Sequence, residues 1–559
     1  ATQLRALLTN NPHGQHVALQ QLRDSGDPQH LFFQTLLELS TTKLVASSDI
    51  ELLFHCAHGM RHVILSQWDA LEPSFQCEAR DYLLDLGLGL YGRRCSNNVG
   101  SSPSPLPKAV AGACLSAAAV FWKRCWSAAT TAGAAGNHIL NNNNNNTASF
   151  HGTTNAMMIS NQQHLLRHLE QILLQPDDPA CNADGMTTAE ATCLFLNTLI
   201  GEFNGSSTTG IQLGLSLEYH HQKHRAFERD GHGLQECLRL AMSALGDSVV
   251  RPILQQTGVN NVALPDVLTR RAIAIVSLTI EVLSWEFGGG SAWNAASFAS
   301  SAQVSASLVL IKPPVEWRDY LIRPDFLGAV VNVYMYVRSC VANNLGGQKT
   351  VDLGHHLRQL LLQLSSVSGG IFADQSQSAA YAGFLLEGCL SVLSDAKSKE
   401  QLLEGEIVDM CSMFARLVGN FKVDVLHTLP SFPNFLSAVR EIGHIMLVQN
   451  SVECEVCGGD IEMMEGYEWR EEAFNYILDA IVLMTDDRWL LGSDSEAMKV
   501  SALFASSLSP LYESYVTCRI KMSRLEEMYL VTNAADLDEV REEICATDLE
   551  EQMITAGSF

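Results

Sequence analysis

The sequence predicts an all-α fold built as an array of antiparallel helix pairs. Apolar residues recur at helical spacing along most of the chain, and the alternation and tight turns typical of β-hairpins are missing. A chain of 559 residues would suggest about three or four compact domains, yet no change of composition cuts it into such units. Hydrophobic residues make up 47% of the chain and aromatic residues only 7%, a balance that favours stacked helices rich in Leu and Ala.

The stretch Leu268–Arg338 contains the clearest helix pair. An apolar run from Leu268 to Phe287 has helical spacing and stops at three consecutive glycines, Gly288–Gly290. A turn stiffened by prolines follows and carries Trp317, which we expect to be a buried anchor. A second apolar run covers Phe326–Val337. We therefore expect a helical hairpin in which the second helix packs back against the first.

Further helices are expected wherever an apolar run of ordinary helical length lies between turn residues. A weak helical pattern opens the chain at Leu4, Leu7, Leu8 and Val17. The later runs are His30–Leu39, Ile50–Leu65, Phe75–Leu90, Ala109–Trp126, Leu165–Leu174 and Glu190–Phe203. Two stripes at helical spacing are expected to be core because one face of each stacked helix must be dry. They are Leu357, Leu360, Leu361 and Leu364, and Phe474, Ile477, Leu478, Ile481 and Val482.

Local composition marks four regions within the array. Residues 1–127 are interpreted as N-terminal helical repeats and residues 163–450 as central repeats. Residues 451–559 are interpreted as acidic helical repeats, and we expect the stack to continue beyond the end of this chain. Between the first two regions, residues 128–162 are rich in Asn, Ala and Gly and include Asn141–Asn146. Such a tract cannot bury a core, so we expect a disordered insertion there.

Helix pairs that recur roughly every 40 to 47 residues without a strict signature are typical of HEAT or armadillo solenoids. Each pair exposes apolar area that only its neighbours can cover, so such an array is elongated and presents a long concave surface. A surface of this kind binds proteins. The predicted fold is therefore a HEAT-repeat α-solenoid, a superhelix of antiparallel helix pairs.

The net charge of −25 argues against a nucleic-acid surface, because phosphate binding needs clustered Lys and Arg. It favours a basic protein partner, with an ordinary solvated surface as the alternative. The charge is uneven, since residues 451–559 hold 24 acidic and 7 basic side chains. The 15 cysteines are scattered and indicate buried small hydrophobes in a reducing compartment, the nucleus or cytoplasm. No uninterrupted apolar run reaches the length of about 18 residues that a membrane span needs.

Two glycine-rich stretches resemble phosphate-binding motifs only in their letters. Gly87–Gly92 matches the spacing of a dinucleotide fingerprint, but it follows Tyr82–Leu86, which continues a helix, whereas the fingerprint needs a strand before it. Gly346–Thr350 lacks the residue order of a phosphate loop and is interpreted as a linker. We expect no nucleotide cofactor.

Two other groups of residues have spacings known from zinc sites. His220 and His224 lie one helical turn apart with His221 beside them, but no local Cys or carboxylate completes a ligand set. The favoured interpretation is an exposed polar helix face. Cys454 and Cys457 form half of a zinc motif without a second pair at fixed spacing, and are interpreted as part of a loop. We expect no metal, and no arrangement of residues typical of a catalytic site stands out.

Short blocks that follow one another in order from about Arg80 to the chain end are similar to one known family. The blocks are Gly214–His220, Arg225–Phe227, Glu281–Phe287, Val309–Pro313, Glu316–Arg318, Gly370–Asp374, Phe384–Gly388 and Leu511–Tyr515. Their order, more than any single block, carries the likeness. The chain resembles the exportins, which are nuclear transport receptors of the importin-β (karyopherin) superfamily.

The resemblance implies a HEAT-repeat receptor with an armadillo-type fold that shuttles between nucleus and cytoplasm through nuclear pores, where it meets nucleoporins. It implies that the GTPase Ran in its GTP form and a protein cargo bind together, and that GTP hydrolysis releases both. Cargo expected from the resemblance includes the hypusine-containing translation factor 5A and Smad-type factors. Linkage requires that each ligand raises the affinity for the other by the same factor.

The N-terminal repeats of the family contact Ran, and the resemblance places Arg80, Lys123 and Arg124 on the GTPase-facing edge. The alternative is that these residues are solvated cations at helix ends. We expect charge reversal at Lys123 and Arg124 to weaken Ran binding without unfolding the chain. The alternative function is a HEAT-repeat interaction scaffold that works without Ran, and an enzyme with a hidden pocket is the third possibility.

Overall fold

The computed structural model describes Phe33, Thr35, Trp68 and residues 47–66, 71–90, 106–126, 150–175, 186–204, 216–230, 232–256, 263–287, 311–398, 404–456, 468–487, 489–490 and 495–516. Helices account for most of these residues, and the one β-type contact among them is an isolated parallel bridge between Ile311 and Val367. The fold is all-α, as predicted, and the helices pack in the repetitive manner of a HEAT-repeat α-solenoid. No helix within the described ranges is long and apolar enough to span a membrane.

The chain divides into two compact units, which we describe separately. Unit 1 comprises Ala1–Phe298 with Gln348–Leu353, and unit 2 comprises Ala299–Gly347 with Gly354–Phe559. The described elements of unit 1 are α4 (Ser47–Ser66), α5 (Pro73–Gly87), α7 (Lys108–Cys125), α8 (Phe150–Leu174), α9 (Thr188–Phe203), α11 (Leu217–Arg225), η2 (Ala226–Asp230), α12 (Gly233–Ala244), η3 (Leu245–Val250), α13 (Arg251–Gln256) and α14 (Asp266–Leu283). Those of unit 2 are η5 (Val315–Trp317), α16 (Arg318–Leu321), α17 (Pro324–Ala342), α19 (Gln375–Ser398), α20 (Glu404–Leu426), α21 (Phe432–Val456), α23 (Glu468–Thr485) and α24 (Ser495–Tyr515), while α18 (Gln348–Ser365) begins in unit 1 and continues in unit 2.

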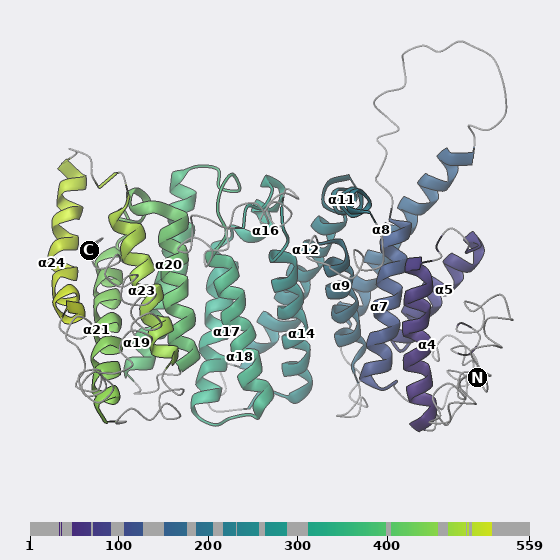
Figure 1. Ribbon diagram of the computed structural model, residues 1–559, viewed down its shortest axis with the longest axis horizontal. Coiled ribbons are helices and arrows are strands. Elements are labelled where there is room, and N and C mark those ends of the chain that lie inside the picture. Colours follow the sequence, from purple (N-terminus) through teal and green to yellow (C-terminus); the bar gives the residue numbers. More distant parts are fainter. Residues whose placement is uncertain are drawn as a thin grey trace, which may run out of the picture. The chain divides into compact units, whose positions relative to one another are not determined.

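Unit 1 is built from two rows of helices (Figure 1). In the first row, α4, α7, α9 and α14 each pack against the next helix of the row. Side chains join their C-terminal ends: Arg124 of α7 reaches Leu65 of α4, and Asn204 after α9 reaches Ser284 after α14. These helices therefore run parallel to one another. In the second row, α5 packs on α7, α8 on α9, and α12 on both α8 and α14.

Unit 2 repeats the arrangement. One row contains α20 and α23, whose contact is the most extensive among the described helices, and α18 joins α20 through the Arg358–Asp409 ion pair at 2.6 Å. The side-chain amide of Asn420 also donates to the carbonyl of Ser365 at 2.6 Å, close to the ends of both helices. The second row contains α17, α19, α21 and α24, in which α17 packs on α19 and α21 packs on α24.

A capping box both starts α9 and ties it to its neighbour. The Thr187 hydroxyl accepts a bond from the amide of Glu190, and the Glu190 carboxylate accepts one from the amide of Thr187. The same carboxylate receives Nε of Arg270 from α14 at 2.9 Å. Local helix initiation and the packing of α9 on α14 therefore depend on one side chain.

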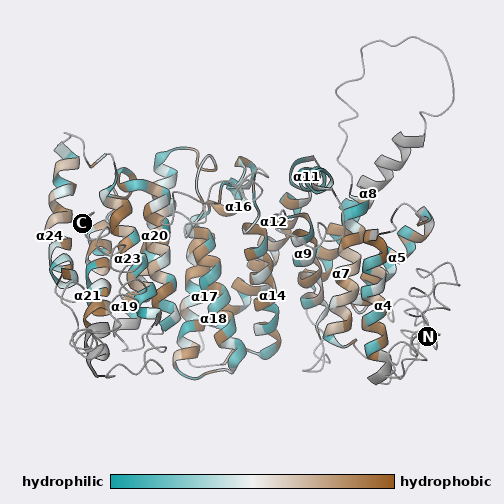
Figure 2. Cartoon of the chain, viewed as in Figure 1, coloured by the Kyte–Doolittle hydropathy of each residue, from teal (hydrophilic) through white to brown (hydrophobic). Residues whose placement is uncertain are grey.

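The apolar stripes predicted from the sequence lie in the core. Leu357, Leu360, Leu361 and Leu364 of α18 are buried, as are Phe474, Ile477, Leu478 and Ile481 of α23, while Val482 is partly exposed. Figure 2 shows apolar residues concentrated where neighbouring helices meet within each unit. Trp317 is also buried, as expected for an anchor.

One expectation differs from the structure, and another is not tested by it. Both helices of the predicted hairpin exist: α14 packs on α9 and α12 within unit 1, and α17 packs on α19 within unit 2. The packing of the second of these helices against the first stays a prediction. Helix α8 begins at Phe150, inside the stretch expected to be disordered up to residue 162, because extending a helix from a packed segment is easier than nucleating one. The opening pattern Leu4–Val17 and residues 128–149 lie outside the described residues.

A buried ion network holds three helices of unit 2 together. The Glu406 carboxylate of α20 accepts a hydrogen bond from Nε of Arg338 on α17 at 2.8 Å, and another from the hydroxyl of Tyr334. Arg338 extends to Asp395 of α19 at 2.6 Å. The side chains of Arg338 and Glu406 are each only 1% exposed, so water does not screen their charges.

We predict that Glu406→Gln lowers the free energy of unfolding of unit 2 by about 3 kcal/mol, because it removes a buried carboxylate that pairs with the buried Arg338. Glu404→Gln is the matched control, since Glu404 lies two residues away on α20 and is exposed, and this variant should change stability little. Urea unfolding monitored by circular dichroism measures both. Equal effects of the two substitutions would contradict the role of the network.

Candidate partner-binding site

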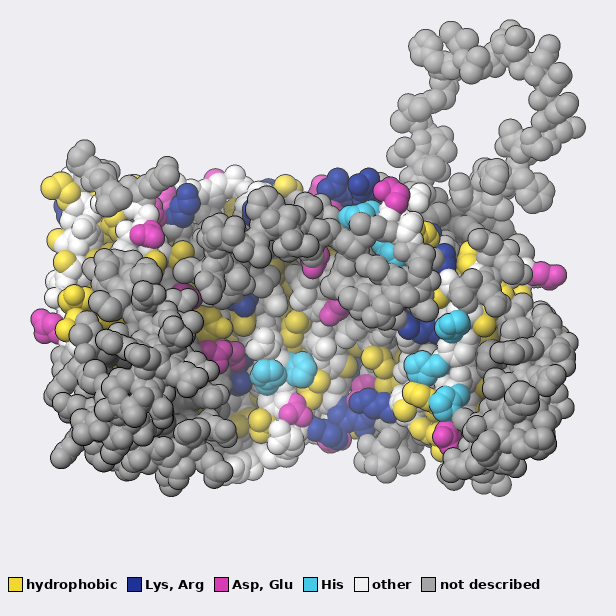
Figure 3. Space-filling model, in the orientation of Figure 1, with side chains coloured by type: hydrophobic (Ala, Val, Ile, Leu, Met, Phe, Trp, Pro, Cys, Tyr) yellow, Lys and Arg dark blue, Asp and Glu magenta, His cyan; other side chains and the backbone are white. Residues whose placement is uncertain are grey.

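The three sequence-predicted site residues lie in unit 1, and two of them, Lys123 and Arg124, lie where the ends of α4, α7 and α9 meet α11. We define the cationic joint as Arg61, Lys123, Arg124, Glu202, His220 and Lys223. Four of these six side chains are cations, and Glu202 is the one carboxylate among them. Figure 3 shows Lys, Arg and His side chains gathered at the surface over α11.

Lys123 lies at the centre of the cationic joint and is 4% exposed. Its ammonium group donates to the backbone carbonyl of Glu202 and lies 3.8 Å from the carboxylate of the same residue. His220 Nδ1 is 3.2 Å away, and Arg61 binds the Glu202 carboxylate at 2.6 Å. Burial lowers the pKa of Lys123 to about 8, although the nearby Glu202 charge opposes the shift.

Arg124 and Lys223 donate hydrogen bonds to backbone carbonyls at the ends of other helices. Arg124 donates to the carbonyl of Leu65, at the end of α4, at 2.8 Å, and its guanidinium lies 4.9 Å from the centre of the Tyr219 ring. Lys223 of α11 donates to the carbonyls of Arg124 and Trp126 at 2.8 and 2.6 Å. The last carbonyls of a helix have no partner within that helix, so each cation satisfies acceptors of a neighbouring helix. Burial lowers the pKa of Lys223 to about 8.

Arg80 of α5 lies away from the cationic joint, on the other side of α7. Its guanidinium stacks on Trp122 at 4.2 Å and pairs with Asp81 at 2.7 Å, and the residue is 6% exposed. The structure therefore brings Lys123 and Arg124 together at one joint and places Arg80 elsewhere.

The burial of Arg80 and Lys123 contradicts the interpretation of these residues as solvated cations at helix ends. The expectation that reversing the charge of Lys123 leaves folding intact stays a prediction, and burial argues against it because a carboxylate there would face Glu202 in a buried site. Arg124 is partly exposed and can meet a partner directly. Whether these residues face Ran stays a prediction.

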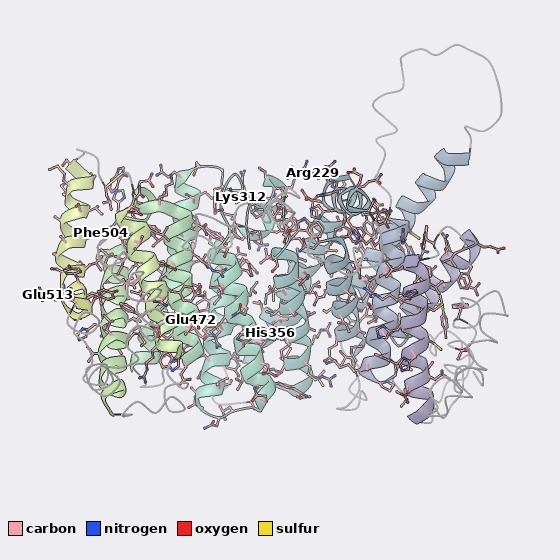
Figure 4. The ribbon with its side chains drawn as sticks, in the orientation of Figure 1. Arg229, Lys312, His356, Glu472, Phe504 and Glu513 are labelled. Atoms are coloured by element: carbon pink, nitrogen blue, oxygen red, sulfur yellow. The ribbon has the colours of Figure 1, made fainter. Side chains whose placement is uncertain are left out.

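His220 and His224 of α11 are buried and His221 is partly exposed, which contradicts the interpretation of these residues as an exposed polar face. His224 Nδ1 lies 3.1 Å from the carbonyl oxygen of Phe203, and its Nε2 lies 3.1 Å from Glu228. Its ring stacks on Trp285 with centroids 4.4 Å apart. Burial alone would raise the pKa of Glu228, but bonds from His224, Trp285 and Arg229 lower it to about 2. Arg229, labelled in Figure 4, reaches solvent beside α11. Within the described ranges, no cluster of three or more His, Cys, Asp or Glu has the geometry of a metal site.

An aromatic cluster that sequence reasoning missed lies beside the cationic joint. Phe203 stacks on Phe227 at 4.3 Å, and Trp126 contacts both rings edge-on at 5.5 and 5.0 Å. Gly233 must be small here, since a Cβ atom would lie 2.5 Å from Trp126. These rings come from distant parts of the sequence, and the one shared signal is that Trp126 and Phe203 each end an apolar run.

The remaining sequence motifs have structural roles. Helix α5 ends at Gly87, and Gly89 has a φ of +70°, so a helix and not a strand precedes the glycine run, as expected. Lys349, expected in a linker, lies in the first turn of α18 and pairs with Asp266 at 2.8 Å. Cys454, expected in a loop, lies in the last turns of α21, whereas Cys457 is outside the described residues.

We predict that His220 makes folding less stable in mild acid. Burial and the charges of Lys123, Arg124 and His221 lower its pKa from 6.5 to about 4. Between these values the unfolded chain takes up a proton that the folded chain does not, so stability falls as pH falls from 6.5 towards 4. His220→Gln should therefore flatten the decline in unfolding free energy between pH 7 and pH 5. The measurement is urea unfolding at both pH values, and an unchanged decline would contradict it.

Comparison with known families adds to this geometry. The family model described as Exportin-4 matches residues 162–554, which is more than half of the chain. The matched segment begins after Arg80, Lys123 and Arg124 and includes His220, Lys223 and every described helix of unit 2. Exportins are transport receptors and not an enzyme family. The chain therefore belongs to the exportin-4 family, whose members are nuclear export receptors of the karyopherin type.

Proposed function

We propose that this chain binds Ran in its GTP form together with a protein cargo and carries that cargo from nucleus to cytoplasm. The observation that carries the proposal is the family match over residues 162–554. The stacked helices of each unit support it, because small rotations between neighbouring helix pairs sum to a large change of curvature. If Ran and cargo favour the same curvature, each raises the affinity for the other by the same factor.

The proposed Ran-facing residues have different roles. Arg124 offers a partly exposed guanidinium at the joint and can pair with an acidic group of the GTPase. Lys123 and Arg80 are buried and act as positioning residues that hold α7 against α9 and α5. Arg124 is therefore the member of the set whose loss tests binding most directly.

The cargo and pore partners follow from the family resemblance. The expected cargo includes the hypusine-containing translation factor 5A and Smad-type factors, with nucleoporins as partners during passage through the pore. The net charge of −25 supports a basic cargo, because electrostatic attraction between opposite charges speeds association. The receptor would then be found in both nucleus and cytoplasm.

We predict that the full chain binds Ran loaded with a non-hydrolysable GTP analogue and not Ran loaded with GDP. Arg124→Ala should weaken the GTP-form complex by about tenfold, the equivalent of about 1.4 kcal/mol for one charge-assisted contact. Arg167→Ala removes an equally charged, exposed side chain from α8 and should leave the affinity unchanged. Titration by biolayer interferometry measures all of these complexes.

Binding that is equal for the two nucleotide forms, or no binding to either, would contradict the proposal and favour a HEAT-repeat scaffold that works without Ran. Equal weakening by Arg124→Ala and Arg167→Ala would keep the proposed function but remove Arg124 from the contact surface. Circular dichroism of each variant shows whether the fold is retained.

A further inference from the structure

Two thiols of unit 1 differ from the deeply buried cysteines around them. Cys77 of α5 is exposed and Cys125, the last residue of α7, is partly exposed. Both side chains are reduced thiols in the structure. They belong to helices that pack directly against each other.

The antiparallel register of α5 and α7 places these two cysteines opposite each other. A Cβ atom on Gly87 would lie 2.6 Å from Leu115, so these residues face each other. Arg80 lies seven residues before Gly87 on α5, and Trp122 lies seven residues after Leu115 on α7. The guanidinium carbon of Arg80 is 4.2 Å from the centre of the Trp122 ring, so these two residues also face each other. One more helical turn in the same direction leads to Cys77 on α5 and to Cys125 on α7.

Arg80 connects the two thiols electrostatically. Its guanidinium hydrogen-bonds the Cys125 thiol, and its charge interacts with both Cys125 and Cys77. Burial raises the pKa of Cys125 to about 11, while Arg80 and Lys223 act in the opposite direction by favouring the thiolate. A thiolate beside a fixed cation is the reactive form of cysteine, and exposure of Cys77 gives an oxidant access to the pair.

We propose that Cys77 and Cys125 form an oxidation site that closes to a disulfide when the protein meets hydrogen peroxide. The Cys77 thiolate attacks one peroxide oxygen, the O–O bond breaks, and Cys77 becomes a sulfenic acid while the first water leaves. Cys125 then attacks the sulfenic sulfur, the S–O bond breaks, and the second water leaves as the disulfide forms. The two thiols lose two electrons in all, and the peroxide is reduced to water.

The disulfide would join α5 to the last turn of α7. That turn carries Lys123 and Arg124 and supplies the carbonyl of Arg124 that Lys223 binds. Oxidation would therefore restrict movement of α5 at the edge of the cationic joint. This consequence concerns the α5–α7 contact itself and does not depend on which partner binds there.

The chain contains two comparison pairs of neighbouring thiols. Cys56 of α4 and Cys114 of α7 interact electrostatically, and both are buried, with their pKa raised to about 12 by burial. Cys389 and Cys411 form a similar pair between α19 and α20, also raised in pKa by burial. In both cases burial keeps the thiols protonated and away from solvent. The two thiols of each buried pair are close to each other, as Cys77 and Cys125 are. These pairs lack the solvent exposure of Cys77 and the neighbouring guanidinium of Arg80.

The test treats the full chain with hydrogen peroxide under native conditions, blocks remaining thiols with iodoacetamide and maps peptides by mass spectrometry without reduction. The expected product is a peptide pair linked through Cys77 and Cys125, with the two buried pairs recovered as alkylated thiols. Cys77→Ser should abolish the linked product. Arg80→Gln should slow its formation by about tenfold, because it removes the positive charge that interacts with both sulfur atoms.

Three results would overturn the proposal. One is oxidation of Cys77 to sulfinic acid without linkage to Cys125. Another is linkage of Cys56 to Cys114 at the same rate, which would show that unfolding and not the site governs reactivity. The third is an unchanged rate in Arg80→Gln when circular dichroism shows a native helix content. Arg80→Lys keeps the positive charge and should restore most of the rate if charge is the cause.

Discussion

Unit 1 depends on one kind of hydrogen bond, in which a side chain of one helix donates to the backbone carbonyls at the end of a neighbouring helix. Because α4, α7, α9 and α14 run parallel, their unpaired terminal carbonyls collect at one edge of the row. Arg124 covers the end of α4, Lys223 covers the end of α7, and Lys123 covers the end of α9. Asn204 does the same for α14. Each contact ties one helix to the next, so satisfying the backbone also sets the register of the stack.

This arrangement explains why so many cations are buried in an acidic protein. A Lys or Arg removed from water needs compensation, and helix carbonyls with their negative partial charge supply it alongside Glu202. The lowered pKa values of Lys123 and Lys223 show that compensation is incomplete. A joint that holds charge at such a cost responds to small changes of geometry, which would suit the ligand-dependent change of curvature that we propose for this chain.

Much of the fold could be predicted from the sequence, because the helical spacing of apolar residues indicates which face of each helix is buried. The stripes on α18 and α23, the presence of α14 and α17 and the burial of Trp317 follow from that pattern. The partners of charged residues could not be predicted in the same way. Lys123 and Arg124 look like solvated helix-end cations until α9 and α11, which lie far along the chain, are brought against them. The same limit applies to His224, whose buried setting depends on Phe203, Glu228 and Trp285.

Hydrogen exchange at the end of α7 tests the central claim most directly. Lys223→Met keeps the aliphatic part of the side chain but removes the ammonium group that binds the carbonyls of Arg124 and Trp126. If cross-helix covering of carbonyls holds the joint, amides in the last turn of α7 should exchange faster in this variant, while those of α20 and α23 in unit 2 stay as protected as in the parent chain. Unchanged protection at the end of α7 would contradict the account.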